Sequence, residues 1–227
     1  MQAATPTPII ETTTPRVVFV HGLFMSGREG VLLSRRLRRQ ALPCERFVYS
    51  SLRDNPEEAA ARLASRLRAE PALHLIGHSL GAVIVAMAIA AVPEWRGRAV
   101  LLGPPLAGSV TARRAAVLPG GRRLLGSGGR FLLGELHFGR SSRRVLVIAG
   151  VRNFGVGRLI GSCPGPGDGQ VRLVETRLAG AAHRSVRRGH MALLFDRRVA
   201  RAVASFFRDG NPPGATLPAP SPGYRRL

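Results

Sequence analysis

The chain has 227 residues, of which 45% are hydrophobic, so it can form one globular domain with a sizeable core but hardly two. The formal net charge is +21, and because the sequence contains no lysine, all 34 of its Lys and Arg positions are arginine. The arginines are spread along the chain and are not interleaved with aromatic residues, so specific nucleic-acid binding is not expected. Compositional bias alone would explain them, although the charge would also permit weak association with an anionic membrane surface.

Both ends of the chain have the composition of unstructured segments. Residues 1–15 are rich in Thr and Pro and lack the basic and apolar stretches of a secretion signal, so we expect a disordered N-terminal segment. Residues 209–227 are rich in Pro and Gly and are also expected to be disordered. Cys44 and Cys163 are expected to be free thiols, and with no secretion signal we expect a cytoplasmic location.

From Arg16 onward, short apolar segments alternate with helical patterns. Residues 16–20 form a β-branched run that is typical of a buried parallel strand. A helical pattern follows over 29–40, and a second short strand is expected over 45–49. This alternation predicts an α/β domain.

The next strand leads into a turn with a serine at its centre. A helix between Pro56 and Pro71 is followed by the apolar run 72–76 and by Gly77-His78-Ser79-Leu80-Gly81. Glycines two residues before and after Ser79 leave room for a sharp strand-to-helix turn, which would expose the hydroxyl in strained backbone geometry. The apolar segment 82–92 then predicts a buried helix. This context indicates a nucleophilic serine rather than a serine in an ordinary turn.

Two further buried strands are expected at 98–102 and 144–150, with a long segment between them. Residues 104–143 are rich in Gly and Arg and contain helical fragments. A connection of this length is unusual inside a compact domain. It is therefore either a helical crossover or a small cap beside the active site.

A serine nucleophile needs a base that accepts its proton and an acid that orients the base. In the chain order that accompanies a serine elbow the acid follows the serine. The acidic residues after the 144–150 strand are Asp168, Glu175, Asp196 and Asp209. Asp168 lies in a glycine-rich loop that can approach other backbone closely, whereas Glu175 is expected to be a solvated charge on a strand. We therefore assign Asp168 as the acid.

Two histidines follow the acid in the sequence. His190 comes directly after residues 184–188, which can form the last strand, so it would lie at the carboxyl edge of the sheet, where catalytic groups collect. His183 precedes that strand and would lie at the opposite edge. His190 is therefore assigned as the base. The other four histidines are expected to have structural roles or have no assigned role: His21, His74, His78 and His137.

An oxyanion hole requires two N–H donors. One is the backbone N–H of Leu80, the residue after the nucleophile, and the second is expected from Leu23 or Phe24 in the loop after the first strand. No cluster of His, Cys and acidic residues has metal-ligand spacing, and no glycine-rich phosphate loop follows a strand. Neither a metal nor a cofactor is therefore expected.

The combination of His21-Gly22, the 77–81 pentapeptide, Gly167-Asp168-Gly169 and Gly189-His190 resembles the α/β-hydrolase superfamily. Within it, the chain is similar to small bacterial lipase/esterase-like hydrolases and to the hydrolase core of the PGAP1-type lipase-like group. The resemblance covers residues 16–208 and implies the α/β-hydrolase fold, with about six strands in a mainly parallel sheet and helices on both faces. No strand is expected before Arg16, so the N-terminal antiparallel strands of the full fold would be lacking.

The resemblance implies a serine hydrolase that cleaves a small carboxylic ester with an acyl or lipid-like group, using Ser79, His190 and Asp168. A thioesterase, an amidase or an acyltransferase would use the same three residues, and the insertion at 104–143 that would decide specificity cannot be interpreted from sequence. A non-catalytic arginine-rich binding protein on the same scaffold is the alternative from another class. The complete Ser, Asp and His set argues against it.

Overall fold

The computed structural model of the chain describes residues 15–134, 144–155 and 165–210. Six strands form one sheet in the order β2-β1-β3-β4-β5-β6, and every neighbouring pair among them is parallel. The predicted α/β class with a mainly parallel sheet is therefore confirmed. The expectation that no strand precedes Arg16 concerns residues 1–14, which lie outside the described residues.

The strands are short, and their side chains are mostly buried because helices cover both faces of the sheet. Their bounds are β1 (Val17–Val20), β2 (Cys44–Arg46), β3 (His74–His78), β4 (Ala99–Leu102), β5 (Val145–Gly150) and β6 (Ala182–Val186). Two predicted strands were placed too late in the sequence. β2 ends at Arg46 rather than Tyr49, whose hydroxyl turns inward and donates to the carbonyl of His21 at 2.6 Å. β6 covers 182–186 rather than 184–188.

In the described parts of the chain the helices follow the predicted pattern, and residues 104–134 of the insertion contribute three of them. They are α1 (Val31–Arg38), α2 (Pro56–Ala69), α3 (Leu80–Ala90), α4 (Val110–Val117), α5 (Gly121–Leu124), α6 (Gly129–Leu133) and α7 (Arg197–Asp209). α2 begins with the side chain of Asn55 accepting a hydrogen bond from the Glu57 N–H at 3.0 Å. α7 includes Asp209, which the sequence placed in the tail, and Gly210 in left-handed geometry ends the helix. Residues 211–227 lie outside the described residues.

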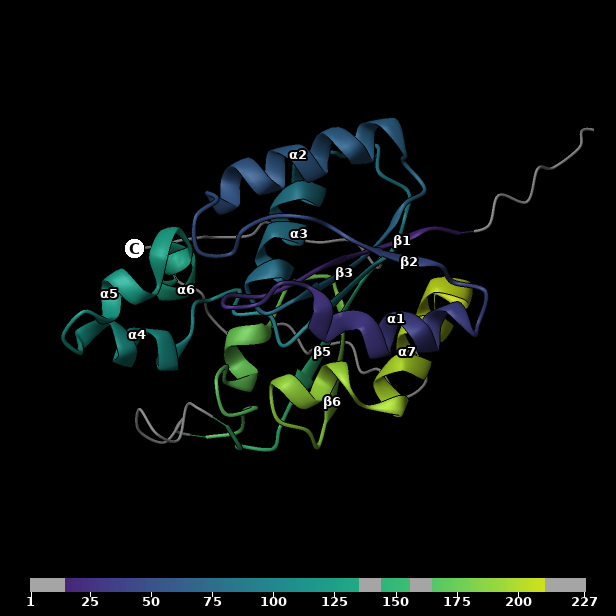
Figure 1. Cartoon of the computed structure of the whole chain (residues 1–227). Coiled ribbons are helices and arrows are strands. Elements are labelled where there is room, and N and C mark those ends of the chain that lie inside the picture. The colour runs from purple at the N-terminus through teal and green to yellow at the C-terminus, as the bar shows by residue number, and fades with distance from the viewer. Residues whose placement is uncertain (1–14, 135–143, 156–164, 211–227) are drawn as a thin grey trace, which may run out of the picture.

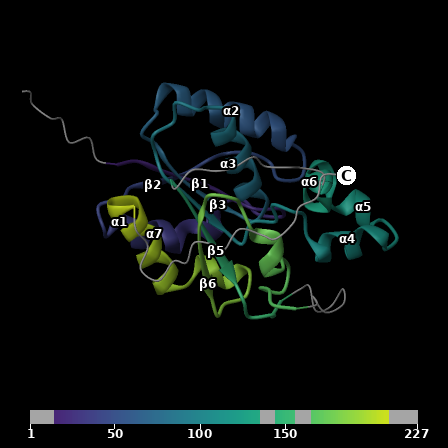
Figure 2. The same cartoon turned by 180° about the vertical axis from the view of Figure 1, so that it is seen from behind.

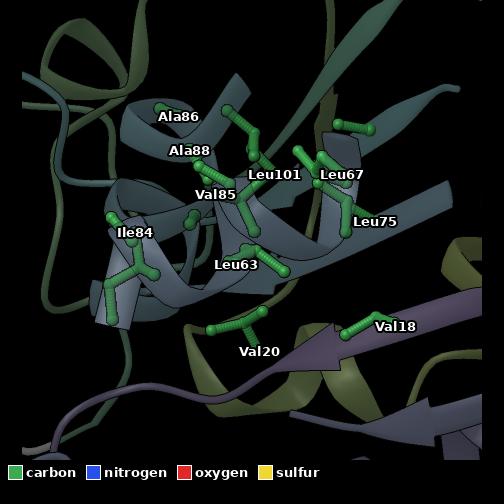
Figure 3. Close-up of a cluster of buried hydrophobic side chains, with 14 of the residues drawn as sticks. Val18, Val20, Leu63, Leu67, Leu75, Ile84, Val85, Ala86, Ala88 and Leu101 are labelled. Carbon is green, nitrogen blue, oxygen red and sulfur yellow. The ribbon is translucent and has the colours of Figure 1, made fainter. Parts of the chain in front are cut away.

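Two layers of helices enclose the sheet, with α2 and α3 on one face and α1 and α7 on the other (Figure 1, Figure 2). Alternate side chains of β1 pack against the helices on opposite faces of the sheet. Val18 and Val20 pack with Leu63 of α2 in the cluster drawn in Figure 3. Val17 and Phe19 pack in the opposite cluster with the apolar residues of α1 and α7. The core therefore fixes the sheet from both sides.

None of the helices in the described residues is long and apolar enough to span a membrane.

The described part of the insertion lies at one end of the domain (Figure 1). Phe131 and Leu132 of α6 form a buried cluster with Leu80 and Val83 at the start of α3. The insertion therefore packs against the helix that begins directly after Ser79. Residues 135–143 of the insertion lie outside the described residues. The role of the whole insertion as a cap stays a prediction.

Candidate active site

Ser79 lies in the turn that joins β3 to α3, and its backbone has the strained geometry that the pentapeptide predicted. Its φ is 54° and its ψ is −124°, a conformation that L-residues rarely adopt. A Cβ on Gly77 would lie 2.4 Å from Cα of Ala82, and a Cβ on Gly81 would lie 2.2 Å from the carbonyl oxygen of Val20. Both flanking positions therefore require glycine, because the turn is packed directly against backbone.

The loop after β1 also approaches the serine closely. A Cβ on Gly22 would lie 2.9 Å from Cβ of Ser79, so only glycine fits at this position. His21 itself is buried and holds the loop in place: its ring stacks on Tyr49 at 4.3 Å, and its Nε2 lies 3.2 Å from the Tyr49 carbonyl oxygen. His21 therefore has the structural role expected from the sequence.

Asp168 and His190 form a buried pair. Nδ1 of His190 donates to Oδ2 of Asp168 at 2.7 Å, and the His190 backbone N–H donates to the Asp168 carbonyl oxygen at 2.9 Å. The second carboxylate oxygen, Oδ1, accepts from the N–H groups of Gln170 and Val171 at 2.9 and 2.8 Å. The three side-chain bonds hold the carboxylate in one orientation towards the imidazole, and the backbone bond holds the two residues together.

The protonation states follow from these partners. Burial by itself would raise the pKa of Asp168, but the positive charge and hydrogen bond of His190 and the two backbone N–H groups outweigh it and hold that pKa below its usual range. Because a carboxylate only accepts hydrogen bonds, the ring proton of neutral His190 is on Nδ1 and the lone pair is on Nε2. This Nε2 is buried and has no hydrogen-bond partner in the described part of the chain.

The Ser79 backbone and the Asp168–His190 pair both lie at the carboxyl end of β4. The Ser79 N–H donates to the carbonyl oxygen of Leu102 at 3.0 Å. The next residue, Gly103, has a φ of +53°, and a Cβ there would lie 3.0 Å from both His190 Nδ1 and Asp168 Oδ2. The structure thus brings Asp168 and His190 into contact and puts Ser79 at the same end of the sheet. No hydrogen bond joins Ser79 to His190 in the described residues, and such bonds often tighten only in the substrate complex.

His78, the last residue of β3, contacts His190, which sequence reasoning missed. Its Nε2 donates to the His190 carbonyl oxygen at 3.3 Å, and the two rings lie 4.7 Å apart. Complete burial, reinforced by the charge of His190, lowers the pKa of His78 to about 3. His78 is therefore neutral at ordinary pH and holds the backbone of His190.

The remaining described histidines lie away from this pair. His74 accepts a hydrogen bond from the Arg98 N–H at 3.2 Å and stacks on Phe207. His183 is the second residue of β6 rather than a residue before it, and its Nε2 lies 3.0 Å from Oγ1 of Thr176. It still lies near the amino end of the strand, at the opposite edge from His190. His137 and Cys163 lie outside the described residues.

The prediction for Glu175 is wrong. Glu175 is not a solvated charge on a strand but a buried residue of a 3-10 helix, Leu173–Thr176. Its Oε1 accepts from Arg113 Nη2 at 2.6 Å and from the Val110 N–H at 3.0 Å, and its Oε2 accepts from the Arg172 N–H at 2.8 Å. The strand was expected wrongly because a single helical turn also exposes one residue, Val174, and buries the next, Glu175.

Glu175 joins the insertion to the acid loop. Arg113 and Val110 belong to α4, whereas Arg172 belongs to the loop that carries Asp168. A second connection runs in parallel, because Ser109 Oγ donates to the Gln170 carbonyl oxygen at 2.7 Å. The first turn of α4 is therefore fixed directly against the residues that hold the Asp168 carboxylate.

The predicted oxyanion-hole donors are Leu80 and either Leu23 or Phe24. Leu80 is the first residue of α3, where backbone N–H groups have no acceptor within the helix. Leu23 packs against the buried cluster that contains Leu80. Phe24 has a φ of 58° and is 56% exposed. Leu80, Leu23 and Phe24 as N–H donors stay a prediction.

The described residues contain no group of three or more His, Cys, Asp or Glu side chains that could hold a metal ion. Cys44 is a free and buried thiol. Burial raises its pKa to about 11, so it is a poor nucleophile.

Comparison with known proteins gives matches among solved structures. No protein-family model matches the chain, and no curated protein matches it. The mature form of the lipase BlEst2 from Bacillus licheniformis is 18% identical with a TM-score of 0.59, over 84% of this chain and 90% of that one. The carboxylesterase CesB from Bacillus subtilis is 16% identical with a TM-score of 0.52, over 88% and 85% of the two chains.

A third match is a protein named for a different activity. The meta-cleavage product hydrolase CumD from Pseudomonas fluorescens is 13% identical with a TM-score of 0.59, over 87% of this chain and 92% of that one. At these identities the likeness concerns the fold alone. The similarity to PGAP1-type hydrolases stays a prediction.

Proposed function

The chain has the α/β-hydrolase fold, and we propose that it is a serine hydrolase that cleaves a carboxylic ester. The observation that supports this most strongly is the buried Asp168–His190 pair, whose unpartnered Nε2 lies at the same end of the sheet as the strained Ser79. A buried polar nitrogen without a partner costs free energy, so its presence needs an explanation. Its use as the base for the serine hydroxyl is such an explanation.

In the proposed reaction, Ser79 Oγ attacks the ester carbonyl carbon while His190 Nε2 takes its proton. The charge that then develops on the imidazole is stabilised by Asp168, which itself stays ionised. The N–H of Leu80, with that of Leu23 or Phe24, would bind the oxyanion. His190 returns the proton to the leaving alkoxide, which departs as an alcohol and leaves an acyl ester on Ser79. A water molecule activated by the same base then releases the acid.

The apolar surroundings of the elbow favour an acyl or lipid-like group over a charged one. Leu80 and Val83 of α3 pack with Phe131 of the insertion, and Leu23 packs against them. The same constellation would serve a thioesterase, an amidase or an acyltransferase, because the three proposed residues are shared by all of these reactions. The cytoplasmic location and a weak association with anionic membranes stay predictions.

The direct test is hydrolysis of a p-nitrophenyl ester series from acetate to palmitate, with a matched thioester and anilide for the preferred acyl group. The proposal expects the ester to be turned over fastest, and expects His190→Ala to abolish turnover. His183→Ala is the control, because this histidine is also partly buried near the sheet but contacts Thr176 instead. Preference for the thioester or anilide would change the reaction class. Absence of turnover with every substrate would favour a non-catalytic binding protein.

A further inference from the structure

An arginine-lined groove lies between α1 and α7, which are side by side in both views (Figure 1, Figure 2). It forms a hollow of about 490 Å³. The arginines that line it come from both helices and from the residue after α1: Arg35, Arg36, Arg39, Arg197 and Arg201. None of the described residues that line this hollow is acidic.

A second hollow of about 370 Å³ adjoins the first and shares Arg36 and Arg197 with it. It adds two more arginines, Arg188 and Arg198, and one acidic residue, Asp196. That carboxylate is already used: it pairs with Arg188 and accepts from the N–H groups that begin α7. The two hollows together therefore form one concave, strongly basic surface.

Most of these guanidinium groups lack an internal counter-charge. Arg36 donates to the Phe195 carbonyl oxygen at 2.6 Å, which is a neutral acceptor. The side chains of Arg35, Arg39, Arg197 and Arg201 have no hydrogen-bond or ion-pair partner in the described residues.

Carboxylates pair with arginines elsewhere in the structure. Arg16 and Arg66, for example, both bind Glu45 and Glu70. The groove thus holds like charges together without neutralising carboxylates of the kind that Arg16 and Arg66 have.

We propose that this groove binds a small anion that carries two or more phosphate groups. Guanidinium groups offer paired N–H donors that match phosphate oxygens, and several of them on one concave surface raise the local potential for anions. A volume of about 490 Å³ falls within the range typical of small-molecule sites. Two hollows that share two arginines suit a ligand with linked phosphates better than one with a single phosphate. The site is independent of Ser79.

Inorganic tripolyphosphate is the probe, titrated calorimetrically into the full chain. The groove variant combines Arg35→Gln, Arg197→Gln and Arg201→Gln. The control variant combines Arg53→Gln, Arg122→Gln and Arg123→Gln, which removes the same three charges from positions that line neither hollow. We expect one ligand per chain, a loss of affinity of about tenfold or more in the groove variant, and a loss below about threefold in the control. Tripolyphosphate should raise the Tm of the wild type and the control, but not that of the groove variant.

Equal losses in the two variants would overturn the proposal, because they would show general attraction by the net charge. So would binding of several tripolyphosphate ions per chain. Binding only to phosphatidylglycerol vesicles or to single-stranded nucleic acid, with none to tripolyphosphate, would also contradict it. If the triple variant does not fold, Arg201→Gln compared with Arg123→Gln gives the same test. Ser79→Ala must bind tripolyphosphate like the wild type.

Discussion

Nδ1 of His190 lies 2.7 Å from Oδ2 of Asp168, and both side chains are buried. The other oxygen of the carboxylate is occupied by two backbone N–H groups, so Asp168 cannot rotate without losing them. The imidazole is held in the tautomer that leaves Nε2 free to accept a proton. Substitutions at Asp168 and at residues around the pair can therefore test the proposed roles one at a time.

Asp168→Asn should keep the fold and abolish most turnover. The Asn carbonyl oxygen can replace Oδ1 as the acceptor for Gln170 and Val171, which leaves the amide NH₂ facing His190. Nδ1 must then accept, Nε2 carries the proton, and the base is blocked. We expect kcat to fall on the order of 10⁴-fold, the effect of the same change in a serine protease. Steady-state kinetics on a folded variant measures this, and a loss below tenfold would indicate a dyad without an essential acid.

Gly103→Ala should impair catalysis through geometry alone. The added Cβ would lie 3.0 Å from His190 Nδ1 and Asp168 Oδ2, so the pair must shift. Gly120→Ala is the control: its φ of +74° gives similar backbone strain, but nothing lies within 4 Å of the new atom. Both variants should lose about 1–2 kcal/mol of stability, and only Gly103→Ala should lose about tenfold or more in kcat. Equal kcat values would mean that the pair tolerates displacement.

Glu175→Gln should destabilise the protein more than it slows the reaction. The substitution removes the negative charge of the buried Glu175 carboxylate, which binds Arg113 and Arg172. We expect a fall of about 1–3 kcal/mol in the free energy of unfolding. Glu57→Gln is the control, because Glu57 and its partner Arg130 are both about half exposed. The free energy of unfolding of this variant should fall by less than about 1 kcal/mol. Urea unfolding compares the two. A larger loss of kcat in Glu175→Gln than in Asp168→Asn would make Glu175 the acid.

The stability of the protein should fall in mildly acidic solution because of His78. Its pKa is lowered to about 3 in the folded chain, whereas an unfolded histidine titrates near 6.5. Between these values the unfolded chain binds a proton that the folded chain does not. The contribution of His78 to stability is therefore complete above about pH 6.5 and is lost progressively as the pH falls towards 3.

Urea unfolding from pH 4 to pH 7 tests this with His78→Gln, which cannot titrate. The variant should show a shallower decrease in stability with falling pH than the wild type. Some decrease should remain, because burial, reinforced by the charge of Arg98, also lowers the pKa of His74 to about 4. Identical slopes would show that His78 takes up a proton in the folded state.

Local sequence patterns were sufficient for the sheet and for the serine turn. The four inner strands, β1, β3, β4 and β5, are largely apolar, whereas the edge strands β2 and β6 are not and were placed too late. The glycines around Ser79 are required by contacts within the turn and with the neighbouring strand. Asp168 and His190 could be selected from chain order and from the edge of the sheet at which each segment ends. Short segments of the sequence are therefore enough to identify these features.

Other features depend on contacts between distant segments. Glu175 is buried because α4, about 62 positions earlier, supplies Arg113 as its partner. Gly103 is next to the Asp168–His190 pair only because of how β4 and the acid loop meet, although a glycine at the end of a buried strand was a signal that could have been used. The arginine groove requires Arg36 and Phe195, 159 positions apart, to be neighbours. No periodicity in the sequence encodes these relations.

The central claim is that Ser79 is a nucleophile activated by His190. Reaction of the purified chain with a fluorophosphonate, followed by mass spectrometry of the modified peptide, tests it most directly, because the reagent requires an activated serine but no particular natural substrate. We expect one phosphonate per chain on Ser79, no labelling of Ser79→Ala, and greatly slowed labelling of His190→Ala. Labelling that persists in Ser79→Ala, or a folded wild-type chain that does not react, would contradict the account.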